Sequence, residues 1–302
     1  MPIKYNTMGY RVFTALNYLF LVLLAVVTVF PYLNVLAQSF NNGIDTARGG
    51  LTIYPRVFTL DNFKIIVNDL SIRRAALVTV ARVLLGTSLN LFFTFTAAYA
   101  FTRKNMRGRS AMYVFLIIPM FFGGGLIPYY VLLSKIHLLN KFWVYIIPTM
   151  FGFFNMIIMR TYIYTISENL VESAKLDGAT DFRILGQLIL PLSKPIIATI
   201  GLWQMVSNWN DWVTTLYFVT KPSLYTLQYM LEQLIREQSR INDMIQQAIK
   251  SGAGTSNMAV VALTPESVKS AQVIITTIPI IMVYPFLQKY FIKGALIGAL
   301  KD

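Results

Sequence analysis

Residues 168–195 read ENLVESAKLDGATDFRILGQLILPLSKP, and they separate two long apolar segments of the chain. The stretch is too polar to cross a bilayer, where a span needs about 20 mostly apolar residues. Apolar residues recur at helical spacing on both sides of Gly178, a pattern typical of two short helices around a turn. The stretch is therefore predicted to be a helical hairpin attached to membrane-spanning segments at both of its ends.

Capping residues predict where each helix of this hairpin begins and ends. Ser167 is expected to cap the first helix, and Gly178 is expected to end it in the left-handed conformation that glycine adopts without strain. Thr180 or Asp181 is expected to cap the second helix, and Pro191 to end it.

The spacing of seven positions resembles the EAA loop of permease subunits in bacterial ATP-driven (ABC) importers. That family's pattern is Glu-Ala-Ala, three residues, Gly, nine residues, then Ile-x-Leu-Pro, and this chain fits the spacing throughout. An ordinary cytoplasmic loop or a DNA-binding helix-turn-helix is the alternative, but neither explains several fixed positions between membrane segments. The positions that the resemblance assigns to docking on a cytoplasmic ATPase are Glu172, Ser173, Ala174, Asp177, Gly178, Leu190 and Pro191.

Composition independently indicates a membrane protein. Hydrophobic residues make up 56% of the 302 residues and charged residues 13%, which excludes disorder and an ordinary soluble domain. The chain has no cysteine and one histidine, His137, so a thiolate or histidine-based metal site is not expected. The net charge of +13 is explained by Lys and Arg on the cytoplasmic side rather than by nucleic-acid binding.

Apolar runs predict an all-α integral membrane protein with six spans in a single transmembrane domain covering 1–302. Four basic residues in the short loop after the second span place that loop inside. Six spans then leave both termini inside, on the same face as the coupling loop 165–194 and the tail 288–302, with segments 38–74 and 221–267 outside. The predicted spans are 12–37, 75–101, 111–133, 142–163, 195–219 and 268–287.

The third predicted span contains Pro119, a glycine triplet at 123–125 and Pro128. Such breaks persist in lipid only where the freed backbone faces protein or a water-filled path. A simple helix kink is an equally open interpretation of the same residues. The external segment 221–267 is predicted to contain an amphipathic helix or pair of helices, because charged residues alternate with apolar ones over 224–250.

A polar run in the fifth predicted span is the candidate substrate path. Amides and a carboxylate at this depth are costly unless they face a polar cavity, while indole rings suit the C–H faces of sugars. On one continuous helix Asn208, Asp211 and Trp212 would share a face that lines the path, and Trp209 and Asn210 would point towards neighbouring helices. An interfacial aromatic belt is the alternative for the two tryptophans. Arg82 is a weaker candidate that could snorkel outward.

Three further stretches resemble the maltose-type carbohydrate-uptake permeases, in the subgroup that handles complex oligosaccharides. They are Leu138-Leu139-Asn140, the run 208–212 and the tail from Tyr284 to Lys301. The resemblance implies the six-transmembrane-helix type I ABC importer fold with cytoplasmic coupling helices. Ser167, where a proline is common, and Asp302, where a glycine is usual, depart from the family pattern.

The resemblance implies a non-enzymatic subunit of the bacterial inner (plasma) membrane that imports an oligosaccharide by alternating access. Its implied partners are a sister permease (a heterodimer), two ATPase subunits, an extracellular solute-binding protein and membrane lipid, with no nucleic acid. ATP and Mg are expected on the partner ATPases and no cofactor on this chain, because it contains no phosphate-binding Gly-x-x-x-x-Gly-Lys-[Ser/Thr] loop. The alternative is an ion-coupled secondary sugar transporter; a membrane-embedded enzyme lacks a plausible acid–base pair or metal cluster.

Overall fold

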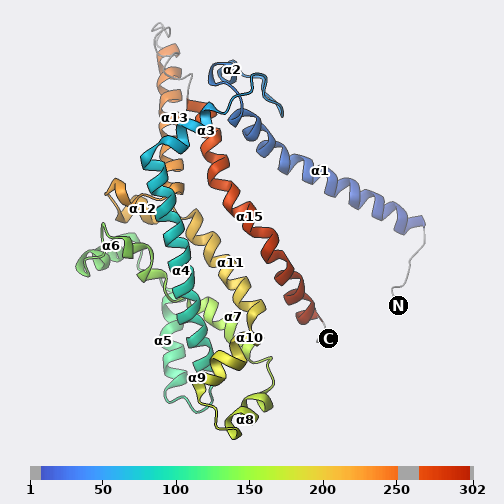
Figure 1. The fold of residues 1–302 in the computed structure, drawn as a ribbon, viewed down its shortest axis with the longest axis vertical. Helices are drawn as coiled ribbons and strands as arrows, with labels where there is room; N and C mark the ends of the chain where they lie inside the picture. Colours follow the sequence, from blue (N-terminus) through green and yellow to red (C-terminus); the bar gives the residue numbers. More distant parts are fainter. Residues whose placement is uncertain (1–7, 251–264, 300–302) are drawn as a thin grey trace. The chain divides into compact units, whose positions relative to one another are not determined.

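The computed structural model describes residues 8–250 and 265–299, and its regular elements in this part of the chain are helices (Figure 1). Residues 251–264 of the predicted external segment, and Asp302, lie outside the described residues. Contacts divide the chain into two units. Unit 1 comprises Met1–Asp69 and Gln233–Thr277, and unit 2 comprises Leu70–Glu232 and Ile278–Asp302.

Unit 1 contains the first predicted span. Helix α1 (Met8–Ser39) is long and apolar enough to cross a membrane, and none of its most apolar 18 residues is buried. The short helices α2 (Gly43–Ala47) and α3 (Asp61–Asn68) follow it. An apolar helix with no buried face in its own chain is stable where lipid or another chain surrounds it.

The segment between α1 and α3 is fixed by the buried side chain of Asn41. Its amide donates to Asp45 Oδ2 and Thr46 Oγ1, both at 2.9 Å, and accepts from the Val57 N–H at 2.8 Å. Arg56 Nε contacts the same Asp45 oxygen at 2.9 Å. These hydrogen bonds, that from Asn41 first and that from Arg56 second, lower the pKa of Asp45 below its ordinary value.

Unit 2 is built on α4 (Leu70–Thr102), which packs most extensively against α11 (Lys194–Asn210) and α7 (Phe153–Ile163) (Figure 1). Their interface is a buried cluster that includes Phe95, Met156 and Ile200. The approach of α4 to α11 depends on small residues. A Cβ on Gly86 would lie 3.0 Å from Asn208 Nδ2, closer than side-chain contacts normally come.

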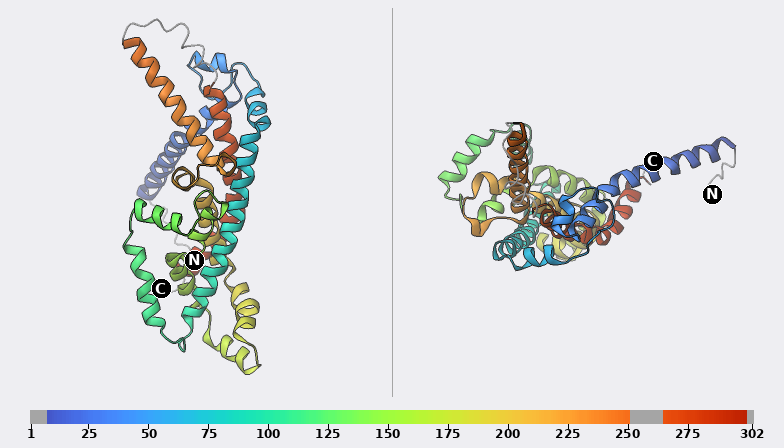
Figure 2. Two further views of the ribbon diagram at one scale, coloured as in Figure 1. Left: turned by 90° about the vertical axis from the view of Figure 1, so that its left-hand side faces the viewer. Right: turned by 90° about the horizontal axis from the view of Figure 1, so that it is seen from above.

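The third predicted span, 111–133, is interrupted at its glycine triplet. Helix α5 (Arg109–Phe121) and helix α6 (Leu126–Lys135) meet at an angle of 120°, which is too large for a simple kink (Figure 2, left). The reversal occurs in the glycine triplet, where Gly125 adopts φ +78°. Glycine reaches this conformation without the strain that a Cβ would cause.

The fourth and fifth predicted spans are also interrupted. The 3₁₀ turns η1 (Phe142–Tyr145) and η2 (Ile147–Thr149, with Pro148) precede α7 and are bent 45° from it. In the predicted span 195–219, α11 ends at Asn210 and α12 (Val213–Phe218) begins after a break. Among the described residues, three helices are long and apolar enough to cross a membrane. The count rises to at most six if each of three bent pairs of helices, within 109–135, 142–163 and 181–210, forms one span.

Two long helices complete the described chain. Helix α13 (Leu227–Lys250), preceded by the 3₁₀ turn η4 (Pro222–Leu224), forms in the segment where an amphipathic helix is predicted. Helix α15 (Pro265–Ala299) covers the sixth predicted span, 268–287. It continues as far as Ala299, so most of the tail predicted at 288–302 is helical.

Asn140 joins the turn after α6 to the end of α12. It adopts φ +59°, and its Oδ1 accepts from the Thr220 N–H at 2.6 Å, the Thr220 hydroxyl at 2.8 Å and the Lys221 N–H at 3.3 Å. We expect Asn140→Ala to destabilise the protein by about 2 kcal/mol, because alanine has no acceptor and is strained at positive φ. Asn140→Asp keeps both properties and should melt like the wild type in a thermal unfolding assay of the purified protein. Equal melting of the alanine variant would contradict this role.

Candidate functional site

The turn at Gly178 has the geometry predicted for the hairpin. Helix α8 (Glu168–Leu176) ends in a Schellman motif, in which the Ala179 N–H donates to the Ala174 carbonyl at 2.9 Å and the Gly178 N–H to that of Lys175 at 3.0 Å. Gly178 has φ +77°, as the sequence requires. Apart from its neighbours in the chain, no atom would lie within 4 Å of a Cβ added at this position, so the requirement for glycine is conformational rather than steric.

The helix ends of the hairpin agree with expectation only in part. Thr180 caps α9 (Asp181–Ile184) by accepting from the Arg183 N–H at 3.4 Å, but Ser167 makes no side-chain cap to α8. The second helix continues through a π-helical segment η3 (Leu185–Ile189) into α10 (Leu190–Leu192) and ends one residue after Pro191, where the chain bends by 80° into α11.

One face of the hairpin is buried against neighbouring helices, and the other face is exposed. Val171, Ile184 and Ile189 are buried in the α4–α7–α11 cluster. Leu176 and Phe182, on either side of Gly178, are 89% and 83% exposed. Glu172 is exposed and makes no hydrogen bond or ion pair to the described part of the chain. An apolar pair beside an available carboxylate is a surface suited to docking another protein.

Polar contacts connect the hairpin to the end of α4. Lys104 Nζ lies 3.1 Å from Glu168 Oε2 at the start of α8. The Tyr99 hydroxyl lies 3.4 Å from both the carbonyl and the carboxylate of Asp181, at the start of α9. The Arg103 guanidinium stacks on the Tyr99 ring at 4.1 Å. A displacement of the hairpin can therefore be transmitted to α4 through the contacts that α8 and α9 make with it and with the residues that follow it.

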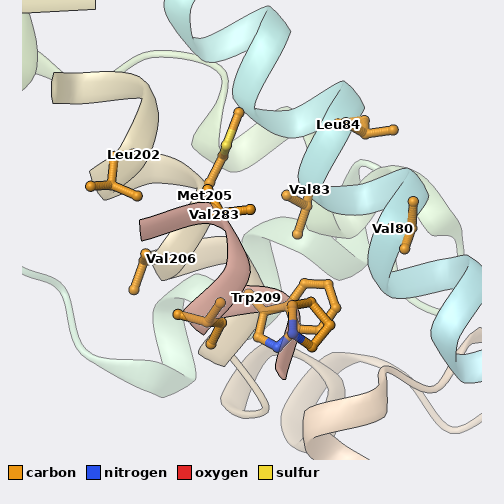
Figure 3. A pocket seen from close by; sticks show the side chains of 10 residues that line it. Val80, Val83, Leu84, Leu202, Met205, Val206, Trp209 and Val283 are labelled. Carbon is orange, nitrogen blue, oxygen red and sulfur yellow. The ribbon is translucent and has the colours of Figure 1, made fainter. Parts of the chain in front are cut away.

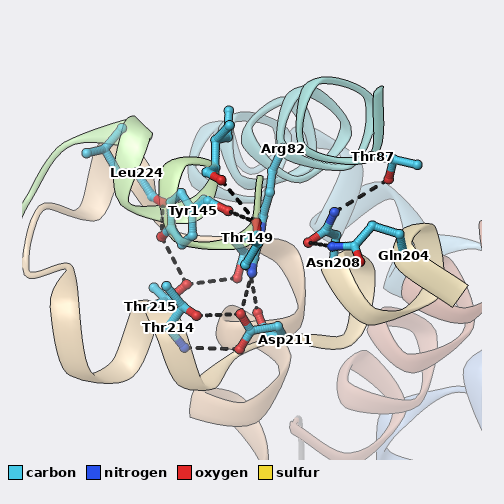
Figure 4. A network of polar contacts seen from close by, with 12 residues as sticks. Arg82, Thr87, Tyr145, Thr149, Gln204, Asn208, Asp211, Thr214, Thr215 and Leu224 are labelled. Atoms are coloured by element: carbon cyan, nitrogen blue, oxygen red, sulfur yellow. Dashed lines mark hydrogen bonds and ion pairs between the residues drawn. The ribbon is translucent and has the colours of Figure 1, made fainter. Parts of the chain in front are cut away.

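A second cluster of polar residues lies where α11 breaks (Figure 4). Arg82, 1% exposed, donates from Nη1 to the Asp211 carbonyl at 2.9 Å and from Nη2 to the Asp211 carboxylate. The other carboxylate oxygen accepts from the Thr214 N–H at 3.0 Å and so caps α12. Asp211 therefore ends one helix, begins the next and neutralises a buried arginine.

Tyr145 extends this cluster towards the base of α13. The Arg82 guanidinium lies 4.7 Å from the centre of its ring. Its hydroxyl bonds the Thr215 hydroxyl at 3.0 Å and the Leu224 carbonyl at 2.8 Å (Figure 4). Thr79 of α4 accepts from the Leu227 N–H at 2.8 Å. The first turn of α13 is thus hydrogen-bonded to the helices of unit 2.

The expectation that Asn208, Asp211 and Trp212 share one helix face is wrong, because α11 ends at Asn210. Asn208 is 3% exposed, and its amide donates to Thr87 Oγ1 at 3.4 Å on α4. It packs between the two helices and does not face an open space in this chain. Asn210 is exposed, and Asp211 and Trp212 are half-buried, so all three residues at the break are accessible.

Trp209 lies on another side of α11, against an apolar groove formed with α4 and α15 (Figure 3). The groove has a volume of about 450 Å³ and is lined by side chains such as Val80, Leu84 and Met205. Polar atoms are nearly absent from its walls, and a sugar hydroxyl bound there would lose its hydrogen bonds. Trp209 therefore faces neighbouring helices in a region unsuited to sugar.

Arg82 is the main functional candidate that sequence reasoning undervalued. Snorkelling was expected, but the side chain is buried against Tyr145 and paired with Asp211, 129 residues away in the sequence. The available signal was charge balance, since one buried cation and one buried anion in the same membrane protein are most stable together. Within the described residues, no group of three or more His, Cys, Asp or Glu side chains could hold a metal ion.

Comparison with known families gives a match over residues 90–296. This part of the chain matches the profile of the family described as "Binding-protein-dependent transport system inner membrane component". The match includes the hairpin and Asp211, whereas Arg82 lies before its first residue.

Comparison with individual proteins extends the similarity to nearly the whole chain. It is 36% identical to "Protein LplC" of Bacillus subtilis (strain 168), covering 98% of this chain and 97% of that protein. It is 33% identical to the "Polygalacturonan/rhamnogalacturonan transport system permease protein YtcP" of the same organism, with coverage of 96% and 99%. Among solved structures, a bacterial ABC transporter involved in import of the acidic polysaccharide alginate matches with a TM-score of 0.83 and 26% identity, covering 95% of this chain and 99% of that chain.

Proposed function

Because the chain belongs to the family of binding-protein-dependent transport system inner membrane components, we propose that it moves its substrate by alternating access driven by separate ATPase subunits. The chain is a permease component of a sugar or oligosaccharide ABC importer and a multi-pass protein of the inner membrane. In the proposed arrangement both termini and the hairpin face the cytoplasm, and the chain itself carries no catalytic site.

The observation that carries this proposal is the hairpin around Gly178. Glu172, Leu176 and Phe182 are exposed on this hairpin, while Val171 and Ile184 are buried in the α4–α7–α11 cluster. A partner ATPase that closes on ATP would push this surface. Contacts such as Lys104–Glu168 would pass the displacement to α4. The seven EAA-loop positions are proposed to dock on this ATPase.

The substrate path is proposed to pass the break between α11 and α12. Asn210 lies 16 residues from the start of α11, a rise of about 24 Å, and in the proposed orientation the break would lie in the outer half of a bilayer. Asn210 and Trp212 offer an amide and an indole face at this level, with Asp211 held beside them by Arg82. Asn208 stabilises this part of α11 through its hydrogen bond to Thr87 on α4. Trp209 stabilises it by packing in the apolar groove.

The other partners follow from the same assignment. A sister permease would complete a heterodimeric core, two ATPase subunits would supply ATP hydrolysis, and an extracellular solute-binding protein would deliver the oligosaccharide. ATP and Mg would bind to the ATPase subunits only. The relatives above include a permease for polygalacturonan/rhamnogalacturonan and an importer of alginate, which supports a complex oligosaccharide as substrate.

An ion-coupled secondary transporter is not favoured by the structure or by the relatives. Such a transporter needs an intramembrane carboxylate that can bind and release an ion. Asp211 is the carboxylate at the break, and its oxygens already accept from Arg82 and Thr214.

Affinity purification tests the proposed assembly. The tagged chain, extracted in mild detergent and analysed by mass spectrometry, is expected to retain a second permease and an ATPase. Gly178→Val, which disturbs the hairpin, should retain the second permease but lose most of the ATPase. A wild-type preparation that contains neither partner would overturn the proposed assembly.

Trp212 and Trp203 provide a matched test of the substrate path. Trp212→Ala should reduce oligosaccharide uptake at least tenfold, because loss of an aromatic platform removes a large contact area from a sugar site. Trp203, on α11, is 45% exposed and lies away from the break, so Trp203→Ala should transport at nearly the wild-type rate. Initial uptake rates at equal membrane abundance make the comparison, and equal rates for both variants would remove Trp212 from the path.

A further inference from the structure

An apolar pocket lies where the second helix of the hairpin bends into α11 (Figure 1). The helical segment 181–192 and α11 meet at an angle of 80°, and α4 provides the third wall of the pocket. The pocket has a volume of about 250 Å³, and its walls are almost entirely apolar. The side chains and backbone around it include Leu91, Phe92 and Phe95 of α4, Leu185 and Gly186 of the hairpin, and Ile197 of α11.

The pocket lies at the depth of lipid chains on the hairpin side of the membrane. Ile197 is three residues after the start of α11, and Phe95 is seven residues before the end of α4, distances of about 5 Å and 10 Å along the helix axes. Each leaflet of a bilayer contributes about 15 Å of hydrocarbon. Phe92 borders the pocket and is 62% exposed, so the pocket is accessible from the surroundings of the chain.

The pocket is too small for a helix of a partner protein. A helix 10–12 Å in diameter occupies at least about 400 Å³ in each turn, more than the volume of the whole pocket. A hydrocarbon chain is narrower, and its burial against apolar walls is favourable. Gly186 adds room for it, since no atom lies within 4 Å of a Cβ built there, apart from the chain neighbours and the backbone of its own helix.

Two exposed basic residues lie beside the pocket. Lys194 is the first residue of α11 and precedes the pocket residue Ile197 by three positions. Arg183 likewise precedes Gly186 by three positions in the second helix of the hairpin. Residues three positions apart are neighbours on the surface of a helix. A positive charge therefore accompanies the apolar pocket on two of its walls.

Neither of these cations is neutralised by a carboxylate in the described part of the chain. Arg183 Nε donates to the neutral side-chain oxygen of Gln187 at 3.0 Å, and Lys194 takes part in no ion pair among the described residues. Asp181, the acidic residue nearest to Arg183 in the sequence, lies 3.9 Å from Lys175 Nζ. An apolar pocket beside unneutralised cations is complementary to a molecule with a hydrocarbon chain and an anionic headgroup.

We propose that this pocket binds an acyl chain of an anionic phospholipid, whose headgroup phosphate is attracted by Lys194 and Arg183. In the proposed orientation this is a lipid of the cytoplasmic leaflet, and only that choice of leaflet rests on the proposed function. Basic pockets between membrane helices on the cytoplasmic side are suited to anionic headgroups. The bound chain contacts α4, α11 and the hairpin together, and so stabilises the bend between the last two.

Photolabelling of the complete complex in lipid nanodiscs tests the site. The probes are phosphatidylglycerol and phosphatidylcholine with identical diazirine-bearing acyl chains, each added at the same mole fraction to unlabelled phosphatidylcholine, and mass spectrometry locates the labelled residues. The anionic probe should label the pocket at least about fivefold more strongly than the neutral one, the factor expected for one cation near a membrane surface. Combining Lys194→Gln with Arg183→Gln should reduce labelling by phosphatidylglycerol to the level of phosphatidylcholine.

Two further substitutions separate the pocket from the charges. Gly186→Leu should reduce labelling by both probes, because its side chain fills the pocket, and Gly186→Ala should reduce it less. Arg107→Gln is the matched control for charge, because Arg107 is an exposed arginine of the loop after α4 and does not border the pocket. It should label like the wild type.

Equal labelling of the pocket by the two probes, labelling that avoids the pocket, or unchanged labelling in the double charge variant would overturn the inference. Crosslinking to the second permease or the ATPase from a photoreactive amino acid at the pocket residue Thr96 would also overturn it, because a protein would then fill the pocket. Absence of the ATPase and second permease from the wild-type complex is a separate result. It overturns the proposed assembly, and lipid labelling can still be measured on the permease that remains.

Discussion

Asp211→Asn is expected to destabilise the membrane core by about 3–5 kcal/mol, the usual cost of leaving one charge of a buried ion pair uncompensated. The asparagine keeps the size of the side chain and can still cap α12 by accepting from the Thr214 N–H. What it loses is the negative charge beside Arg82, which is 1% exposed and cannot be rehydrated in place. The melting temperature of the purified complex and the amount of folded protein in the membrane measure the effect.

Two further variants distinguish the effect of an unpaired charge from the effect of a changed side-chain shape. Arg82→Gln should be less damaging, because the charge it leaves on Asp211 is on a side chain that is 25% exposed. Combining Arg82→Met with Asp211→Asn removes both charges and keeps the cap, so the double variant should be more stable than Asp211→Asn alone. A double variant as unstable as the sum of its two single substitutions would contradict the importance of the ion pair.

Gly178→Val and Glu172→Lys are expected to abolish uptake while leaving membrane insertion intact. Gly178 has φ +77°, a conformation that costs an ordinary residue about 1–2 kcal/mol and a β-branched residue more. Valine would therefore change the angle between α8 and α9. Glu172→Lys reverses the charge of the docking surface without touching a contact within the described chain. Uptake and ATPase retention are measured at equal abundance in the membrane.

Gly178→Asn is the control for the turn, since asparagine tolerates positive φ and no atom crowds the position. It should retain most of the wild-type uptake. If asparagine and valine inactivate the protein equally, a side chain of any kind interferes at this position and the conformational explanation is wrong. Wild-type uptake in both Gly178→Val and Glu172→Lys would remove this hairpin from coupling.

The hairpin could be predicted from sequence because its determinants are local. A left-handed glycine and a threonine cap act on residues within one or two turns, and both Gly178 and Thr180 behave as expected. The π-helical segment before Pro191 was not predictable from such signals, because it depends on how the backbone adjusts to the proline between residues held by tertiary packing. The burial of Val171 and exposure of Leu176 also depend on packing against distant helices.

The break in the fifth span was harder to predict than that in the third, where prolines and a glycine triplet indicate an interruption. Hydrophobicity over 195–219 indicates one span whether or not the helix is continuous. A local signal existed at Asp211 and Thr214, whose spacing is that of a helix cap, but it competes with the apolar pattern around it. The pairing of Arg82 with Asp211 joins residues 129 positions apart, and no periodicity reports such a contact.

ATP-driven uptake by the reconstituted complex tests the central claim most directly. Proteoliposomes that contain the tagged permease with its co-purified partners are supplied with the binding protein, labelled oligosaccharide and a constant ATP concentration, with or without ionophores that dissipate proton and sodium gradients. The account predicts that uptake requires hydrolysable ATP and continues at the same rate when both gradients are removed. Uptake that collapses with the gradients at constant ATP would contradict it and establish an ion-coupled transporter instead.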